Sequence, residues 1–243
     1  MVWAAASMIL KLFTLTLEPA NPVQFSLAEL RSYLTGKLGE YTLLHKESAA
    51  GFIHRYPVVQ CKQIRHSLIV MGISQGSDFL YELAEGQKEI SEDNTSCAIL
   101  ERDASVRNEE FGISGPTCTY EFLTPWLALN QQNAKKFYDL KGKPDRDAFM
   151  HRILVGNLET LAKSLDYKAP VPILCETKLK FRIDRIDREN IIVFLGKFRT
   201  NLRIPDYFGI GQSVSQGFGT IRCIPDNPVP GIRGDHPPGF NVK

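Results

Sequence analysis

Several patterns that commonly mark a protein's chemistry are absent from this chain of 243 residues. Its five cysteines, at positions 61, 97, 118, 175 and 223, are odd in number and scattered, and none forms a C-x-x-C pair. This argues against a disulfide framework and a cysteine-based metal site, and we expect a reducing, cytoplasmic setting. No apolar run is long enough to cross a bilayer, so we expect no membrane partner.

Nucleotide and metal motifs are also missing. The chain has no G-x-x-x-x-G-K-[ST] loop, and none of its histidines, at 45, 54, 66, 151 and 236, belongs to an H-x-x-x-H pair. We therefore expect no cofactor and no bound metal. The composition, 43% hydrophobic and 23% charged, is ordinary for a soluble globular protein.

Charge is sparse but uneven. The net charge is +2, and residues 175–243 contain 11 Lys and Arg against 7 Asp and Glu, whereas residues 1–174 contain 18 against 20. This modest basic bias is compatible with a phosphate-bearing partner, and it is equally common on ordinary solvated surfaces.

A glycine-rich loop, residues 205–221, dominates the C-terminal part of the chain. It reads PDYFGIGQSVSQGFGTI and carries four glycines and two serines between apolar residues. Glycine allows close approach of the backbone to a ligand, and successive N–H groups in such a loop can form an anion-binding nest. The alternative is a simple turn that leads into a last strand over residues 218–224.

Hydrophobic periodicity predicts the same order of elements twice. In the first half we expect strands at 9–17, 52–64, 68–73 and 90–106 and helices at 25–34 and 77–84. In the second half we expect strands at 120–122, 175–186, 191–198 and 218–224 and a long helix at 146–165, with residues 205–211 in place of a second helix. Strand, helix, strand, strand, helix, strand is the ferredoxin-like order.

These elements predict an α+β protein of two tandem ferredoxin-like domains. We place the N-terminal domain at residues 1–110, the C-terminal domain at 111–224, and an extended or disordered Pro/Gly-rich tail at 225–243. Within the strand at 175–186, residues 178–183 alternate strictly, with Leu179, Phe181 and Ile183 on one face and Lys178, Lys180 and Arg182 on the other. A basic ridge that binds an RNA backbone and an ordinary solvated sheet face are both compatible with this pattern.

Three stretches together resemble one known family. They are Leu43-Leu44-His45 followed by Arg55-Tyr56-Pro57-Val58-Val59-Gln60-Cys61-Lys62, then residues 157–165, and then the run from Phe198 to Gly219. In this order they are similar to the CRISPR repeat-processing endoribonucleases of the RAMP superfamily. The resemblance implies two ferredoxin-like domains with RNA across the cleft between them, and CRISPR repeat RNA as the partner. An effector complex and a second copy of the chain are further partners that stay open.

The resemblance implies metal-independent cleavage that leaves 2′,3′-cyclic phosphate and 5′-hydroxyl ends. His45 matches the position of the family's catalytic histidine, and histidine suits proton transfer near neutral pH. His54 is the second candidate, Tyr56 could orient a hydroxyl, and Lys62 or Arg55 could stabilise the transition-state charge. The expected RNA-binding residues are Lys178, Lys180, Arg182, Arg185, Arg199, Gly209, Gly211, Gln212, Ser213, Ser215, Gln216, Gly217 and Gly219.

The chain departs from the family in two places. Lys46 and Glu47 stand where related sequences often carry a second histidine, and Gln212 and Gln216 stand where the loop often carries Lys or Arg. Two alternatives therefore stay open: an RNA-binding subunit that does not cut, and a protein-interaction module that binds no RNA.

Overall fold

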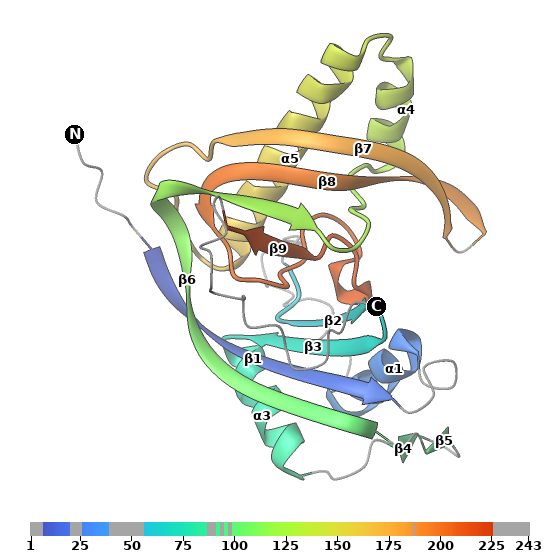
Figure 1. The fold of residues 1–243 in the computed structure, drawn as a ribbon, viewed down its shortest axis with the longest axis vertical. Helices are drawn as coiled ribbons and strands as arrows, with labels where there is room; N and C mark the ends of the chain where they lie inside the picture. The colour runs from blue at the N-terminus through green and yellow to red at the C-terminus, as the bar shows by residue number, and fades with distance from the viewer. Residues whose placement is uncertain are drawn as a thin grey trace, which may run out of the picture.

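The computed structural model describes residues 7–19, 26–38, 56–86, 91–92, 95–96, 99–186 and 188–225. The elements are β1 (Ser7–Pro19), α1 (Leu27–Leu38), β2 (Val59–Ile64), β3 (Ser67–Ile73), α3 (Gln75–Gly86), β4 (Ser91–Glu92), β5 (Thr95–Ser96), β6 (Ile99–Phe122), α4 (Gln131–Asp139), α5 (Lys143–Ser164), β7 (Cys175–Ile186), β8 (Glu189–Arg203), the 3₁₀ helix η1 (Val214–Gln216) and β9 (Ile221–Ile224). Figure 1 shows two groups of strands, one below the other, joined by β6.

The first half is a ferredoxin-like unit. Its antiparallel strands lie in the order β2-β3-β1-β6, and α1 and α3 cover one face. Phe13 and Leu17 of β1 are buried there with Leu30 of α1 and Leu80 of α3. The start of α1 is fixed by Ser26 and Glu29, each of which accepts a hydrogen bond from the other's backbone N–H, as in a capping box.

The second half repeats this arrangement. Its strands lie in the order β7-β8-β6-β9, and α5 packs on the sheet through residues that include Leu154 and Leu158. The described chain between β8 and β9 contains only η1 and no α-helix, so the glycine-rich loop takes the place of the second helix, as the sequence predicted. The prediction of two tandem ferredoxin-like units is confirmed.

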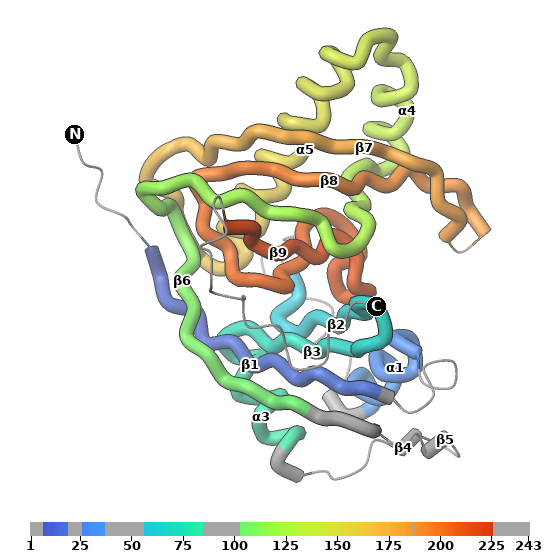
Figure 2. The backbone as a smooth tube through the Cα atoms, viewed as in Figure 1, coloured from blue at the N-terminus to red at the C-terminus, as the bar shows by residue number. Residues whose placement is uncertain are grey.

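The prediction of separate strands at 90–106 and 120–122 is wrong. β6 runs without a break through Gly115 and Pro116, and a register shift between Ile113 and Cys118 replaces the expected interruption. Its first part pairs with β1, and its last residues pair with β8 and β9 (Figure 2). The boundary placed between residues 110 and 111 therefore falls inside one strand, and the division into domains stays a prediction.

Other predicted elements differ at their ends. The helix predicted at 25–34 is α1 and continues to Leu38, the strand predicted at 52–64 is described only as β2, and the last strand begins at Ile221 rather than residue 218. The helix α4 was not predicted, because its sequence QQNAKKFYD buries only Phe137. Residues 41–51 and the predicted tail from residue 226 onward lie outside the described residues.

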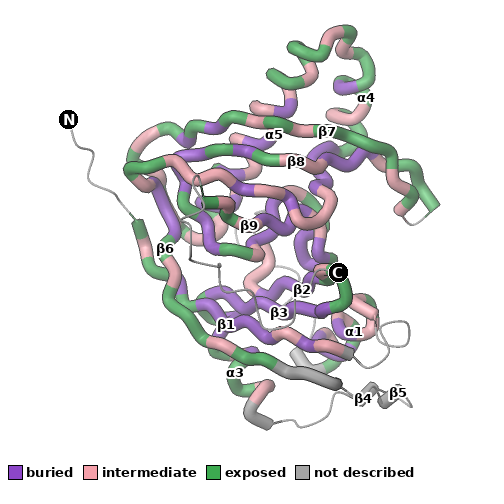
Figure 3. Tube along the Cα trace, viewed as in Figure 1, coloured by how far each residue is buried: buried purple, intermediate pink, exposed green. Residues whose placement is uncertain are grey.

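One hydrophobic cluster joins the two halves. It contains Leu12 of β1 and Met71 of β3 together with Phe111, Phe208 and residues of α5. Figure 3 shows buried segments on the strands of both halves, whereas the tip of the β7–β8 hairpin is mostly exposed. Among the described helices, none has the length and apolar character needed to cross a membrane.

Candidate nucleic-acid interface and catalytic region

The glycine-rich loop folds back on itself before it reaches β9. The Tyr207 N–H donates to the Ile221 carbonyl at 2.8 Å, and the Ile210 N–H donates to the Gly219 carbonyl at 2.9 Å. Phe208 and Ile210 are buried beneath this fold, and Phe208 stacks on Phe111 with ring centroids 6.4 Å apart. Phe208 therefore packs the loop onto the core, and Tyr207 is half-buried.

The conformation of this loop requires glycine at two positions, Gly211 and Gly219. Gly219 has φ +64°, and a Cβ there would fall on the Ile210 carbonyl oxygen. Gly211 has φ +95°, and a Cβ there would lie 2.5 Å from the indole nitrogen of Trp126. Neither position accepts a larger residue without strain.

Most backbone N–H groups of the loop already have protein acceptors. Donors to the protein are the amides of residues 207, 209–212 and 216–221. Within the described structure, the amides of Ser213, Val214 and Ser215 have no acceptor, and they lie together at the loop tip. Of these three residues Ser213 is exposed, whereas Val214 is 4% and Ser215 8% exposed, and the anion-binding nest stays a prediction.

The residues of the loop that were predicted to bind RNA differ in how far they are buried. Gly209, Gly217 and Gly219 are buried, and Ser215 is 8% exposed. Protein atoms cover these three glycines in this conformation, and their contact with RNA stays a prediction. The exposed members are Gln212, Ser213 and Gln216, and Gly211 is intermediate. Their contact with RNA stays a prediction.

Two predicted catalytic residues, Tyr56 and Lys62, lie against the glycine-rich loop. The Tyr56 hydroxyl accepts a hydrogen bond from the Gly211 N–H at 2.8 Å, and the Tyr56 N–H donates to Ser164 Oγ of α5 at 3.0 Å. Burial raises the pKa of Tyr56 to about 12, so its hydroxyl stays protonated at neutral pH. The geometry makes Tyr56 a link between the loop and α5.

Lys62 is fully buried, with 0% of its surface exposed. Its Nζ donates to Gln60 Oε1 at 2.7 Å, and the same oxygen accepts the Gly209 N–H at 3.0 Å. Burial lowers the pKa of Lys62 to about 7. A buried ammonium cannot reach a phosphate on the surface, so the predicted role of Lys62 as the charge-stabilising residue does not fit this structure.

Gln60 is a site residue that the sequence interpretation missed. It is 0% exposed and bonds to both Lys62 and Gly209. Alternation along β2 places Gln60 and Lys62 on one face and Cys61 on the other. Two polar residues at alternate positions of a strand are typical of a solvated face. This face is buried because the glycine-rich loop, about 150 residues later in the chain, covers it.

The candidate histidines are placed as follows. His45, His54 and Arg55 lie outside the described residues, so their catalytic roles stay predictions. His66 is exposed in the turn between β2 and β3. His151 of α5 is half-buried, and its Nε2 forms a hydrogen bond of 2.8 Å with the Cys175 carbonyl oxygen. No group of three or more His, Cys, Asp or Glu in the described chain is arranged to hold a metal ion.

The basic side chains of β7 occupy one exposed face, with the alternation that the sequence predicted. Lys178, Lys180 and Arg182 are exposed, and Lys178 pairs across the ladder with exposed Lys197 of β8. Arg182 also forms an ion pair with Asp184, its Nε 2.7 Å from Oδ1. The lysine pair Lys178–Lys197 and the single Lys180 therefore share this face with a partly neutralised arginine.

The remaining basic candidates extend the same hairpin. Arg185 is exposed near its tip, and the Arg199 Nε donates to Thr117 Oγ1 at 2.6 Å on the surface. On the opposite face, Phe181 is 47% exposed although it packs edge-to-face on Phe137 of α4 at 5.3 Å. The hairpin thus projects beyond the helices that cover the rest of the sheet (Figure 1).

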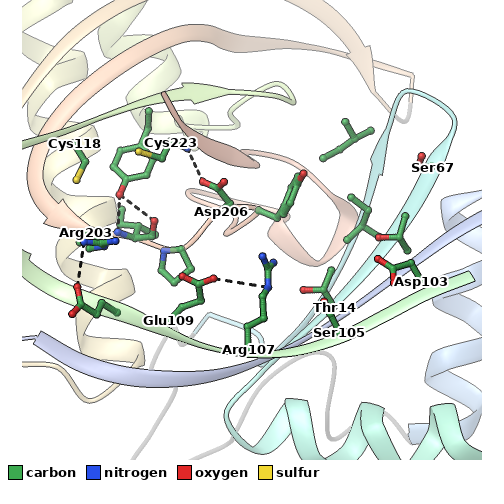
Figure 4. Close-up of a pocket in the computed structure, with 18 of the residues that line it drawn as sticks. Thr14, Ser67, Asp103, Ser105, Arg107, Glu109, Cys118, Arg203, Asp206 and Cys223 are labelled. Carbon is green, nitrogen blue, oxygen red and sulfur yellow. Dashed lines mark hydrogen bonds and ion pairs between the residues drawn. The ribbon is translucent and has the colours of Figure 1, made fainter. Parts of the chain in front are cut away.

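A cavity of about 720 Å³ lies between the two halves of the molecule. Figure 4 shows Thr14, Asp103 and Arg107 on one side of it and Asp206 and Cys223 on the other. The lining contains the acids Glu18, Asp103, Glu109, Glu110 and Asp206 and the bases Arg107 and Arg203.

Both arginines of this cavity are engaged. Arg203 lies 3.2 Å from Glu110, and Arg107 lies 3.9 Å from Glu109 (Figure 4). Burial raises the pKa of Asp206, whose carboxylate accepts the Cys223 N–H. With acids in excess, the cavity does not favour phosphate, so the expectation that RNA crosses this cleft lacks electrostatic support here. The basic hairpin is the better phosphate surface.

Two family models match most of the chain. The family model of the Cas6b N-terminal domain matches residues 8–110, and that of the Cas6b C-terminal domain matches residues 112–224. The uncharacterized protein MJ0978 of Methanocaldococcus jannaschii is 35% identical over an alignment of 127 residues, which covers 49% of this chain and 80% of that protein.

Solved structures show the same similarity in three dimensions. A crystal structure of Cas6b has a TM-score of 0.76 and 30% identity, and one of a CRISPR RNA processing endoribonuclease Cas6b has 0.70 and 29%. Each covers 89% of this chain and 100% of its own. A RAMP protein that binds different RNA substrates, with a TM-score of 0.50 and 12% identity over 88% of this chain and 99% of its own, shares the fold.

Proposed function

The chain belongs to the Cas6b family, and from that premise we propose that it is an endoribonuclease that processes CRISPR repeat RNA. The observation that supports this most is the match of the two family models across residues 8–224, together with a solved CRISPR RNA processing endoribonuclease of the same fold at 29% identity. The exposed basic face of β7 and β8 adds a surface suited to an RNA backbone.

The proposed reaction is metal-independent cleavage within the repeat. A base removes the proton of a 2′-hydroxyl, whose oxygen attacks the adjacent phosphorus, and an acid protonates the departing 5′-oxygen. The products are a 2′,3′-cyclic phosphate and a 5′-hydroxyl. His45 is the proposed base or acid, His54 is the second candidate, and Arg55 replaces buried Lys62 as the proposed charge-stabilising residue.

RNA is proposed to bind on the basic hairpin and the tip of the glycine-rich loop. Exposed Lys178, Lys180 and Arg182 offer cations, and the backbone amide of exposed Ser213 offers an N–H donor. Double-stranded RNA is recognised largely through its shape and its phosphates, which suits such a surface. An effector complex and a second copy of the chain stay as proposed further partners, and the cytoplasm is the proposed location.

The test measures cleavage by His45→Ala. The matched control is His66→Ala, which removes an exposed histidine from the turn between β2 and β3. Under single-turnover conditions with saturating repeat RNA, we expect His45→Ala to cut at least about 100-fold more slowly and to bind RNA normally. His66→Ala should cut like the wild type. Equal cutting by wild type and His45→Ala would remove His45 from the site and move the test to His54.

A subunit that binds repeat RNA without cutting it is the second candidate. It is favoured by Lys46 and Glu47, which stand where related sequences often carry a second histidine. Tight, salt-sensitive binding by the wild type with no detectable cleavage would establish this alternative. Absence of any binding to repeat RNA would contradict both candidates and leave a protein-interaction module.

A further inference from the structure

Two hydrogen bonds connect the beginning of β2, in the first half, to the glycine-rich loop of the second half. The Gly211 N–H donates to the Tyr56 hydroxyl at 2.8 Å, and the Gly209 N–H donates to Gln60 Oε1 at 3.0 Å. The donors are loop amides two residues apart, and the acceptors are four residues apart in the chain. The two bonds therefore fix both the position and the orientation of this part of the loop.

Lys62 stabilises this contact through a hydrogen bond to Gln60. Its Nζ donates to the same oxygen of Gln60 at 2.7 Å, so that oxygen accepts two hydrogen bonds and the amide group has a defined orientation. Gln60 and Lys62 both have 0% exposure, so no water competes for these bonds. A lysine is rarely buried without a carboxylate partner. The bond from Lys62 to Gln60 explains this burial, because it orients the oxygen that accepts the Gly209 N–H.

Packing makes the connection stiff. η1 lies against β2, and a Cβ on Gly217 would come within 3.2 Å of the Cys61 carbonyl oxygen and 3.3 Å of Lys62 Cα. A Cβ on Gly209 would come within 3.1 Å of Gln60 Oε1. The backbones of loop and strand thus approach as closely as glycine permits, and a shift of β2 must shift the loop tip as well.

Tyr56 also marks the end of the segment that carries His45. Residues 45 and 56 are separated by ten residues, and the chain continues from Tyr56 into β2 within three more. We propose that Tyr56 and Gln60, the latter held by Lys62, are positioning residues that fix the glycine-rich loop relative to the strand that follows His45. This rests on the proposed function, because it assigns RNA binding to the loop and cleavage to the preceding segment.

This proposal differs measurably from a catalytic role for the same residues. A catalytic residue that is lost lowers the cleavage rate of bound RNA, whereas loss of a positioning residue for the binding loop weakens RNA affinity first. We expect Gln60→Leu to weaken repeat-RNA binding at least tenfold and to cut saturating RNA within about threefold of the wild-type rate. Gln60→Glu keeps an acceptor for Gly209 and Lys62 and should restore most of the affinity.

The matched control is Gln63→Leu, the same substitution at an exposed position of the same strand. It should bind and cut like the wild type, and both leucine variants should melt as folded proteins. The proposal is overturned if Gln60→Leu binds RNA normally, or if it loses cleavage of saturating RNA while its affinity is unchanged. Equal losses in Gln60→Leu and Gln60→Glu would also contradict it.

A second measurement needs no RNA and separates this proposal from the proposed function. In the free protein, Gln60→Leu should speed amide hydrogen exchange in a peptide that contains Gly209 and Gly211, while Gln63→Leu should not. Faster exchange together with no RNA binding by the wild type would support loop positioning and reject the RNA function. Unchanged exchange would reject loop positioning whatever the RNA result.

Discussion

Lys62 shows how the meaning of a residue depends on what covers it. The sequence marks it as a cation near a candidate histidine, and this led to the prediction of a role in charge stabilisation. The structure places it under the glycine-rich loop with 0% exposure. Alternation in the strand 59–64 predicts that Gln60 and Lys62 share a face, but the burial of that face depends on residues 205–221, so the strand's own sequence does not reveal it.

The pKa of Lys62 leads to a stability prediction. Burial lowers it from 10.5 to about 7, so between these values the unfolded chain holds a proton that the folded chain lacks. The free energy of unfolding therefore rises with pH across this window, and below it the folded protein bears the full cost of a buried charge. Lys62→Met should raise the free energy of unfolding by about 2–4 kcal/mol near neutral pH.

Urea unfolding from about pH 7 to about pH 10 measures this effect. The difference between wild type and Lys62→Met should shrink as the pH rises, because the lysine becomes neutral in the unfolded chain as well. Gln63→Leu, at the neighbouring exposed position, should follow the wild-type curve. A constant difference at every pH would mean that the lysine is charged and stabilised in the folded protein.

The β7–β8 hairpin is the element that the sequence predicted best. Its first strand has the predicted bounds, Cys175–Ile186, because strict alternation of cations and apolar residues is a strong strand signal. The helix α5 was predicted almost as well, since its buried residues recur at helical spacing. α4 was missed because a short helix with one buried residue carries little periodic signal.

The basic face of this hairpin should carry much of the salt dependence of RNA binding. Reversal of Lys178 and Lys180 to Glu removes two exposed cations from one face. We expect affinity for repeat RNA to fall at least tenfold near physiological salt and the dependence on salt to become less steep.

The matched control reverses Lys163 and Lys168, which are equally exposed but lie at the end of α5 and in the segment after it. Filter binding at several salt concentrations compares the two double variants. If the two double variants lose affinity for RNA equally, the net charge of the protein determines binding and the hairpin is not the RNA-binding surface.

At the scale of the whole molecule, the order of elements predicted two ferredoxin-like units, and the structure adds that they share a strand. The sequence predicted separate strands at 90–106 and 120–122, yet β6 continues through Gly115 and Pro116 and pairs with β1 along its first part and with β8 along its second. Long-range pairing of this kind is not encoded in local propensity. The shared strand and the common hydrophobic cluster indicate that the halves stabilise each other.

This leads us to expect a single cooperative unfolding transition. Phe111 is 0% exposed in the middle of β6, where it packs edge-to-face on Tyr167 at 5.5 Å and stacks on Phe208. Phe111→Ala should lower the free energy of unfolding by about 3–5 kcal/mol. Hydrogen exchange in urea should show β3 and α5 losing protection at the same, lower urea concentration. Loss of protection in only one of them would mean that the two halves unfold independently.

The central claim, that this Cas6b family member cuts CRISPR repeat RNA without a metal, has one most direct measurement. Pure wild-type protein is incubated with end-labelled repeat RNA from its own locus in excess EDTA, and the product ends are mapped. The account predicts one cut within the repeat that leaves a 2′,3′-cyclic phosphate and a 5′-hydroxyl. RNA that is bound but stays intact, or that is cut only when a divalent metal is restored, would contradict it.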